Sequence, residues 1–440
     1  MRIIYLIMFF TLRYSTWIIY PRFRRVNGPK SFYGRTIFVS NHPASFMDPL
    51  VIAAKQRSIL FFMTRSDVFT KFTKPFLWAC QMLPIYRQLD GGDTRSKNDL
   101  VFEKTSKILS RGRNLLIFGE GFTDDVFIRR LKPVKKGAVK IGFTALEKLN
   151  WKKKVYIAAI GCNYSDPNQM RSDLLIANSE PICLNDYRET YETNPIKVVS
   201  ELTALIQKLM QEQITHIEKT GNSELHENIM ILTRKGMNAI SFDPAISLYE
   251  RWKYSQNLAT WLNKQDINTD EKLQTIQEEL ENYIKLLKQM KLNDALVYWK
   301  KTNGTRSKEW AALLLLFPLM IVGLIHCFIP YYFVKNFTEK TFKRRVFWSS
   351  VKMILAKFSI GIFNLPFIFV FYHFIYPSWW LAIAYFTSIG LTGTVAYIWF
   401  NNFKSLKAKN AVNKVDLSAL IAKRDHLNTK LLDILPQELA

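Results

Sequence analysis

Apolar runs alternate with polar clusters in the first part of the chain. Three short runs end next to Gly or Asn, at residues 35–41 (RTIFVSN), 114–121 (NLLIFGEG) and 154–164 (KVYIAAIGCNY). Such runs are typical of buried strands. Stretches read as helices separate them, including Leu100 to Arg111 and Lys136 to Leu149. Strands that alternate with helices predict an α/β domain over residues 31–190.

From about residue 191 to residue 305 the pattern is helical. One apolar seam steps by three and four through Leu273, Ile276, Leu280, Tyr283, Leu287 and Met290. Barely three heptads predict a long helix packed on its neighbours, with a coiled-coil dimer as the alternative.

The C-terminal part is much more apolar. Three runs without Lys, Arg, Asp or Glu cover residues 311–334, 358–376 and 377–403. A helix needs about 20 such residues to cross a bilayer core, so we predict a membrane region over residues 306–405 with two or three apolar helices. Core helices of a soluble protein are the alternative, which three runs in so short a segment disfavour. A basic amphipathic tail follows at 406–440.

A weaker apolar segment occupies the N-terminus. It is interrupted by Arg13 and followed by Arg22, Arg24 and Arg25, and no small-residue cleavage site of A-x-A type comes after it. We therefore predict a membrane-associated helix within residues 1–30, with a basic collar suited to anionic headgroups.

Charge narrows the class of partner. Lys plus Arg number 61 against 36 for Asp plus Glu, a net charge of +25, which indicates an anionic partner. The long apolar runs favour lipid and phosphorylated substrates over nucleic acid. The four cysteines lack C-x-x-C or metal-ligand spacing, which indicates a reducing compartment and no structural metal.

The segment SNHPASFMDPL at residues 40–50 carries the first candidate chemistry. On a straight helix His42 and Asp48 would lie on different faces, but Pro43 helps the segment turn. A carboxylate against the imidazole would fix its tautomer, as a general base requires. In the alternative interpretation Asp48 and Pro49 only start a helix, and His42 is an ordinary loop histidine.

Three further clusters follow at strand or helix ends. They contain Arg87 in LPIYR, Glu120 and Gly121 in FGEG, and Lys135 and Lys136 before a glycine that opens a helix. Singly, they read equally well as a surface charge, a turn carboxylate and a solvated face. Together they lie where α/β sheets collect ligands.

In this order the segments resemble the glycerolipid acyltransferase family over residues 30–190. The resemblance implies a sheet flanked by helices, His42 and Asp48 as catalytic residues, Arg87 as the ligand of an acceptor phosphate, and an acceptor site lined by Glu120 and Gly121. Lys135 or Lys136 would assist Arg87.

Three departures concern the acceptor. Five residues separate His42 from Asp48, one more than usual, which resembles the fungal-type glycerol-phosphate/dihydroxyacetone-phosphate branch. Gly119 stands at a usual proline, and Phe122-Thr123 replace the usual Thr-Arg, so a phosphate ligand is missing. The fourth segment, at residues 157–182, lacks its proline before Ile160.

The resemblance implies a membrane-bound O-acyltransferase of phospholipid synthesis whose catalytic domain faces the cytoplasm. The donor would be acyl-CoA or acyl-carrier protein, with no metal or prosthetic group. The acceptor would be glycerol-3-phosphate or 1-acylglycerol-3-phosphate. Alternatives are an acyltransferase of the same fold acting on a phosphate-free amino-acid lipid, and a non-catalytic membrane lipid-binding protein. Positive loops should stay cytoplasmic, so we expect 377–403 to pair with 358–376 as a hairpin, and 311–334 to bend and re-enter the same face. The alternative is that 311–334 is a spanning helix kinked by its prolines.

Overall fold

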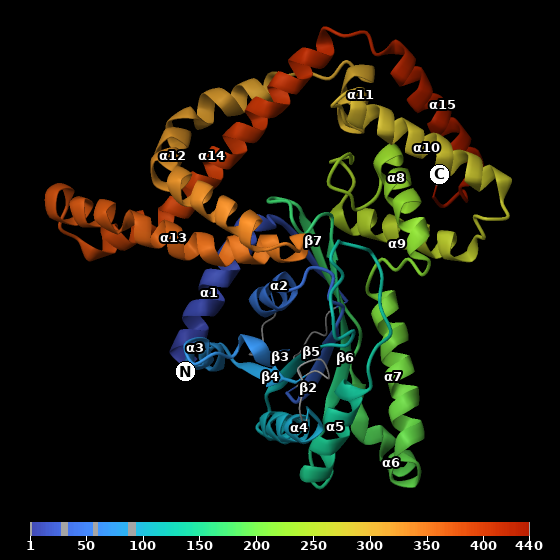
Figure 1. Cartoon of the computed structure of the whole chain (residues 1–440), viewed down its shortest axis with the longest axis vertical. Coiled ribbons are helices and arrows are strands. Elements are labelled where there is room, and N and C mark those ends of the chain that lie inside the picture. The colour runs from blue at the N-terminus through green and yellow to red at the C-terminus, as the bar shows by residue number, and fades with distance from the viewer. Residues whose placement is uncertain (1, 28–33, 56–59, 87–93, 440) are drawn as a thin grey trace. The chain divides into compact units, whose positions relative to one another are not determined.

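The computed structural model describes residues 2–27, 34–55, 60–86 and 94–439 (Figure 1). It divides into two units. Unit 1 comprises Met1–Ser223 and Ser247–Asn263, and unit 2 comprises Glu224–Ile246 and Lys264–Ala440. The chain therefore leaves unit 1, contributes a first segment to unit 2, returns, and leaves again. The helical region expected at residues 191–305 is divided between the two units.

A mixed sheet forms the centre of unit 1. In the described residues its strands are β1 (Arg22–Val26), β2 (Thr36–Ser40), β3 (Leu60–Arg65), β4 (Met82–Ile85), β5 (Asn114–Phe118), β6 (Tyr156–Tyr164), β7 (Asp173–Asn178) and β8 (Ile182–Cys183). Their order is β1-β7-β6-β2-β5-β3-β4, with β8 paired to β6. Pairing is parallel except at β6–β7 and β6–β8. The three predicted strands correspond to β2, β5 and β6, which lie side by side in the middle of the sheet.

Helices cover the sheet. In unit 1 they are α1 (Arg2–Ile19), α2 (Met47–Lys55), α3 (Thr73–Ala79), α4 (Thr94–Ser110), α5 (Gly137–Lys148), α6 (Arg188–Thr193), α7 (Pro195–Glu212) and α9 (Leu248–Lys264, which runs one residue beyond this unit). Ile37 and Val39 of β2 point into a core shared with α4, α5 and α7. Because strand side chains alternate between faces, Phe38 packs on the opposite side, where it is also buried. This burial on both faces explains the continuous apolar runs.

The two edge strands have unusual sequences. β1 reads RFRRV and β4 reads MLPI. Charged side chains and proline are common on sheet edges, where they discourage pairing with further strands. Neither sequence has the apolar continuity of a central strand, and for that reason the sequence pattern did not reveal them.

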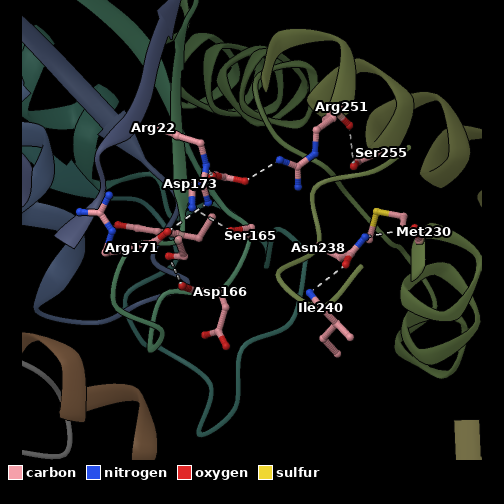
Figure 2. Close-up of polar contacts among 12 residues, drawn as sticks. Arg22, Ser165, Asp166, Arg171, Asp173, Met230, Asn238, Ile240, Arg251 and Ser255 are labelled. Carbon is pink, nitrogen blue, oxygen red and sulfur yellow. Dashed lines mark hydrogen bonds and ion pairs between the residues drawn. The ribbon is translucent and has the colours of Figure 1, made fainter. Parts of the chain in front are cut away.

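A buried ion cluster ties β1, β7 and α9 together within unit 1 (Figure 2). The carboxylate of Asp173 contacts Arg22 on one oxygen and Arg251 on the other, the latter at 2.7 Å. Asp173 and Arg251 are almost fully buried, and Arg22 also donates to the backbone carbonyl of Arg171. The two guanidinium groups compensate a carboxylate that would otherwise be costly to bury.

Unit 2 is helical in its described residues. Its helices are α8 (Ser223–Thr233, whose first residue belongs to unit 1), α10 (Glu271–Gln289), α11 (Asp294–Lys301), α12 (Ser307–Thr341), α13 (Trp348–Val370), α14 (Trp379–Asn413) and α15 (Ser418–Ile434). The predicted apolar seam is the buried face of α10, which packs against α15, except for Met290, which follows the helix and is exposed. Arg424 of α15 joins Asp294 of α11 through a buried bidentate pair at 2.7 and 3.2 Å. The seam thus serves packing within the chain.

Three helical stretches are long and apolar enough to cross a membrane, among the residues that the structure describes: Ser307–Thr341, Arg345–Ile375 and Trp379–Asn413. The chain turns between Ile375 and Trp379, at the predicted hairpin. α12 is one continuous helix in spite of Pro318 and Pro330, and it curves in Figure 1. Prolines inside a helix commonly cause such a bend.

Candidate active site

The parallel register of β2 and β5 positions the candidate site. Ser40 pairs with Phe118 at the last position of both strands. The residues that follow, Asn41-His42 on one strand and Gly119-Glu120 on the other, therefore emerge together at the carboxyl edge of the sheet. Gly119 donates its amide to the Ser40 carbonyl at 3.2 Å, which continues the pairing beyond β2.

The loop after β2 turns back on itself and brings His42 to Asp48. Ser45 adopts a left-handed conformation (φ 50°), and the amides of Met47 and Asp48 close turns onto Ala44 and Ser45. Nδ1 of His42 then lies 2.9 Å from Oδ2 of Asp48. The geometry is that of a histidine whose tautomer is fixed by a carboxylate.

Asp48 is fully buried and has three partners. Besides His42, its Oδ2 accepts the Ala44 amide at 2.9 Å, and its Oδ1 accepts the Tyr164 hydroxyl at 2.9 Å. Burial raises the pKa of the Asp48 carboxyl, and these hydrogen bonds act in the opposite direction. α2 begins at Met47, so Asp48 lies in its first turn and its bond to Ala44 is a helix-start contact. Asp48 is therefore inside the helix, whereas the alternative interpretation expected it to be the N-cap.

The imidazole of His42 is held on one face and open at one nitrogen. Its ring stacks on Phe118 with centroids 4.1 Å apart, and its side chain remains 19% exposed. Within the described residues no hydrogen-bond partner lies at Nε2. With Nδ1 directed at Asp48, Nε2 is the nitrogen that can receive a proton from a substrate.

Glu120 braces the loop that carries His42. Its Oε1 accepts the backbone amide of His42 at 2.7 Å, and its Oε2 accepts the backbone amide of Lys132 at 3.2 Å. Only 3% of the residue is exposed, and this burial raises the pKa of its carboxyl, against the hydrogen bond from His42 and the nearby charge of Lys132. The resemblance implies a place for Glu120 in the acceptor site. Its hydrogen bonds to described residues are to backbone amides, and Nζ of Lys132 lies 3.7 Å from Oε2.

The remaining predicted residues that the structure describes are Gly121, Lys135 and Lys136. Gly121 has a left-handed φ of 79°, and a Cβ added there would lie 2.7 Å from Nζ of Lys135. The backbone conformation therefore favours glycine, whereas the end of the exposed Lys135 side chain can move away from an added Cβ. Lys135 and Lys136 are exposed just before α5. Arg87 lies outside the described residues.

The structure adds residues that the sequence patterns did not reveal. Lys132 is buried, donates to the Phe122 carbonyl at 3.0 Å and lies 3.3 Å from Asp124, which also pairs with Arg130 at 2.8 Å. Burial and the Asp48 charge keep the pKa of the Tyr164 hydroxyl well above its usual value, so it remains a donor. The position of Lys132 beside the predicted lysines was a weak sequence signal, whereas the role of Tyr164 follows only from the fold.

Asn41 fixes the start of the loop to β6. Its side chain exchanges two hydrogen bonds with the backbone of Cys162, at 2.8 and 3.1 Å. A small pocket adjoins this loop, and part of its lining comes from Asn41, Pro43, Arg129, Cys162, Tyr164 and Thr215. No group of three or more His, Cys, Asp or Glu side chains in the described ranges is arranged to hold a metal ion.

Comparisons with known proteins give two similarities. Residues 23–163 match the family model described as Acyltransferase. The chain is also similar to the solved structure of the 1-acyl-sn-glycerophosphate (LPA) acyltransferase PlsC from Thermotoga maritima, at 16% identity and a TM-score of 0.29, over 47% of this chain and 79% of that one. No curated protein sequence matches the chain. Residues 23–163 thus form an acyltransferase domain, and the protein is an acyltransferase.

Proposed function

We propose that this enzyme transfers a fatty acyl chain from an acyl thioester to a hydroxyl of glycerol-3-phosphate or 1-acylglycerol-3-phosphate. The observation that carries the proposal is the pair of His42 and Asp48, with Nδ1 held at 2.9 Å and Nε2 open. The acyltransferase family match over residues 23–163 supplies the reaction class. The donor is acyl-CoA or acyl-carrier protein.

His42 acts as the general base in this mechanism. Its Nε2 takes the proton of the acceptor hydroxyl while the oxygen forms a bond to the thioester carbonyl carbon. The tetrahedral intermediate collapses with cleavage of the carbon–sulfur bond, and the imidazolium returns its proton to the thiolate. Asp48 stabilises the imidazolium, and Glu120 keeps the His42 backbone in place through the 2.7 Å hydrogen bond.

Three predicted cations serve the acceptor phosphate in this proposal. Arg87 is the proposed principal ligand, because a guanidinium can bind a phosphate through two parallel hydrogen bonds. Lys135 and Lys136 are exposed, and Lys135 lies next to Gly121, where it adds positive charge. Glu120 and Gly121 line the acceptor side of the site in this proposal.

A second candidate acceptor is an amino-acid lipid without a phosphate. Two cations that follow Glu120, namely Lys132 and Arg130, are both engaged by Asp124. Phe122-Thr123 also stand where the family usually has Thr-Arg, so a phosphate ligand is missing there. Fewer positive charges are then available near Glu120 to bind a phosphate. This favours an acceptor without one.

A panel of acceptors tests the two candidates. Purified full-length protein would receive labelled acyl-CoA or acyl-carrier protein with glycerol-3-phosphate, 1-acylglycerol-3-phosphate, dihydroxyacetone phosphate or an amino-acid lipid, and mass spectrometry would identify the product. We expect acylated phosphate esters. Exclusive acylation of the amino lipid would select the second candidate, and no product with any acceptor would reject both.

Arg87→Lys sharpens the choice of acceptor. The lysine keeps the charge but loses the planar fork, so the acceptor KM should rise by more than the donor KM. Lys208→Glu, a charge change at an exposed position of α7, is a control that should affect neither. Equal effects of Arg87→Lys on both substrates, or no effect, would remove Arg87 from the acceptor site.

We also propose that the active site faces the cytoplasm and that α12 enters and leaves the bilayer on that side. Contacts within unit 2 support the second part of this proposal, which concerns α12. Near its start α12 contacts the end of α14, through Glu309 and Lys409 at 2.6 Å. Near its end it contacts the start of α13, through Glu339 and Lys352 at 2.7 Å. Since α13 and α14 form a hairpin, both ends of α12 lie with the open ends of that hairpin.

Single cysteines at Asn336 and Ser405, in a background without native cysteines, test this topology. An impermeant maleimide added to intact cells should label neither position, and both should react after permeabilisation. Labelling of Asn336 without Ser405 in intact cells would indicate a full crossing by α12.

A further inference from the structure

The segment 131–135, which follows the loop after β5, is held on two sides. It reads LKPVK, and all four of its backbone amides that can donate a hydrogen bond have an acceptor. Two acceptors belong to the residues directly after β5. The Lys132 amide donates to Oε2 of Glu120 at 3.2 Å, and the Lys135 amide donates to the carbonyl of Gly119 at 2.9 Å.

The other two acceptors are side chains from much later in the chain. Oε1 of Gln207, on α7, accepts the Val134 amide at 2.9 Å. Nδ1 of His216, on the loop that follows α7, accepts the Leu131 amide at 3.0 Å. The segment therefore connects the end of β5 to α7 and its loop.

The loop that carries His216 is itself fixed within unit 1. The side chain of Asn263, near the end of α9, donates to the His216 carbonyl at 2.8 Å and accepts the Glu218 amide at 3.0 Å. The Ile217 amide also donates to the carbonyl of Arg129 at 2.8 Å, just before the segment. The imidazole thus meets the segment from an ordered backbone.

The hydrogen bond from Leu131 requires a neutral His216 ring. Because the amide is the donor, Nδ1 must keep its lone pair, which an imidazolium does not have. Burial lowers the pKa of His216, and the charge of Glu218 acts against that shift. The arginines at 129–130, on the facing strand of chain, are bonded to backbone carbonyls and to Asp124. His216 is therefore neutral at neutral pH.

We propose that His216 is a positioning residue of the acyl transfer, which as a neutral acceptor holds the segment 131–135 and through it Glu120 and the backbone of His42. The route consists of three hydrogen bonds, at 3.0 Å, 3.2 Å and 2.7 Å. A base must be held accurately to receive a proton from the acceptor hydroxyl. The inference rests on the proposed role of His42 as that base.

Two substitutions in the full-length protein test the acceptor. His216→Leu removes it and should lower kcat about fivefold, the size of one lost hydrogen bond. His216→Asn places an oxygen as many bonds from the backbone as Nδ1, and should restore most of the rate. Asn194→Ala is the control: it removes a side-chain acceptor of the Lys197 amide at the start of α7, outside this route, and should leave kcat unchanged.

Hydrogen exchange of peptides that cover residues 129–135 provides a readout that needs no turnover. His216→Leu should speed their exchange, whereas His216→Asn and Asn194→Ala should not. Faster exchange with unchanged kcat would make His216 a structural residue only. A fall in kcat without faster exchange would show that its effect does not pass through the segment. The role of His42 as base is decided separately, by His42→Ala.

The pH dependence gives a third test. The ratio of wild-type to His216→Asn kcat cancels the titration of His42, which both proteins share. The lowered pKa of His216 keeps Nδ1 an acceptor at neutral pH, so the ratio should fall only below about pH 6.5. The same ratio for Gln207→Leu should stay constant, because an amide does not titrate. A constant ratio for His216→Asn down to the pH of unfolding would overturn the requirement for a neutral acceptor.

Discussion

Two histidines, one in each unit, have opposite surroundings. His42 of unit 1 has a carboxylate on Nδ1 and no partner on Nε2 among the described residues. His326 of unit 2 is bonded at both nitrogens, to Asn364 of α13 through Nδ1 and to the Tyr385 hydroxyl of α14 through Nε2 at 2.9 Å. A histidine with a negative partner and an open nitrogen can exchange a proton with substrate. A histidine whose two nitrogens are both hydrogen-bonded to neutral side chains connects helices instead.

The contrast extends to the tyrosines. Tyr164 donates to Asp48 and so acts on His42 through the carboxylate, whereas Tyr385 contacts His326 itself. Asn364 also donates to the His326 carbonyl at 3.0 Å, so α12, α13 and α14 meet in one polar network. Polar groups in apolar helices commonly connect neighbouring helices in this way.

The largest predicted effect separates the two histidines. His42→Ala should reduce kcat by at least about a hundredfold, the low end of what general-base catalysis contributes. His326→Ala should leave kcat per folded molecule near the wild-type value. Both variants would be assayed by acyl transfer after size-exclusion chromatography has confirmed folding. Near wild-type turnover of folded His42→Ala would refute the role of His42 as base. An equal fall in the kcat of His326→Ala would show that the two histidines do not differ in function.

Tyr164→Phe should have an intermediate effect. Loss of one hydrogen bond to a charged group costs about 1.5 kcal/mol, equivalent to roughly a tenfold fall in kcat. The Tyr164 hydroxyl lowers the pKa of Asp48, so its removal raises that pKa. Asp48 then becomes protonated at a higher pH, and the acidic limb of the pH–rate profile should move upward.

Tyr20→Phe is the control for Tyr164→Phe. Its ring lies 5.5 Å from that of Tyr164, but its hydroxyl donates to the Pro167 carbonyl. It tests packing without touching Asp48, and its pH–rate profile should stay unchanged. An unshifted acidic limb in Tyr164→Phe would reduce Tyr164 to a packing residue.

The smallest predicted effect is on stability. Asn364→Leu leaves Nδ1 of His326 without its partner in an apolar region, which should cost about 1 kcal/mol of unfolding free energy. Thermal unfolding in detergent would show a lower midpoint, while kcat per folded molecule should not change. A fall in kcat with an unaltered midpoint would indicate that the network of His326 takes part in function.

Sequence patterns predicted the parts of unit 1 that depend on local order. β2, β5 and β6 are continuous apolar runs because both of their faces are buried, and His42 and Asp48 are six residues apart on one turning loop. Patterns could not predict contacts between distant segments. Tyr164 meets Asp48 across 116 residues, and the backbone contacts of Glu120 arise only because β2 and β5 end at the same edge.

The ion cluster at Asp173 has a consequence for biosynthesis. One of its cations, Arg22, precedes the carboxylate, but the other, Arg251, is synthesised 78 residues later, after the chain has passed through the segment Glu224–Ile246 of unit 2. During translation the Asp173 carboxylate of β7 therefore has only Arg22 as a cationic partner until Arg251 has been synthesised. Because chains grow from the N-terminus at about 5–20 residues per second, the catalytic unit is exposed to chaperones and proteases for several seconds before α9 completes it.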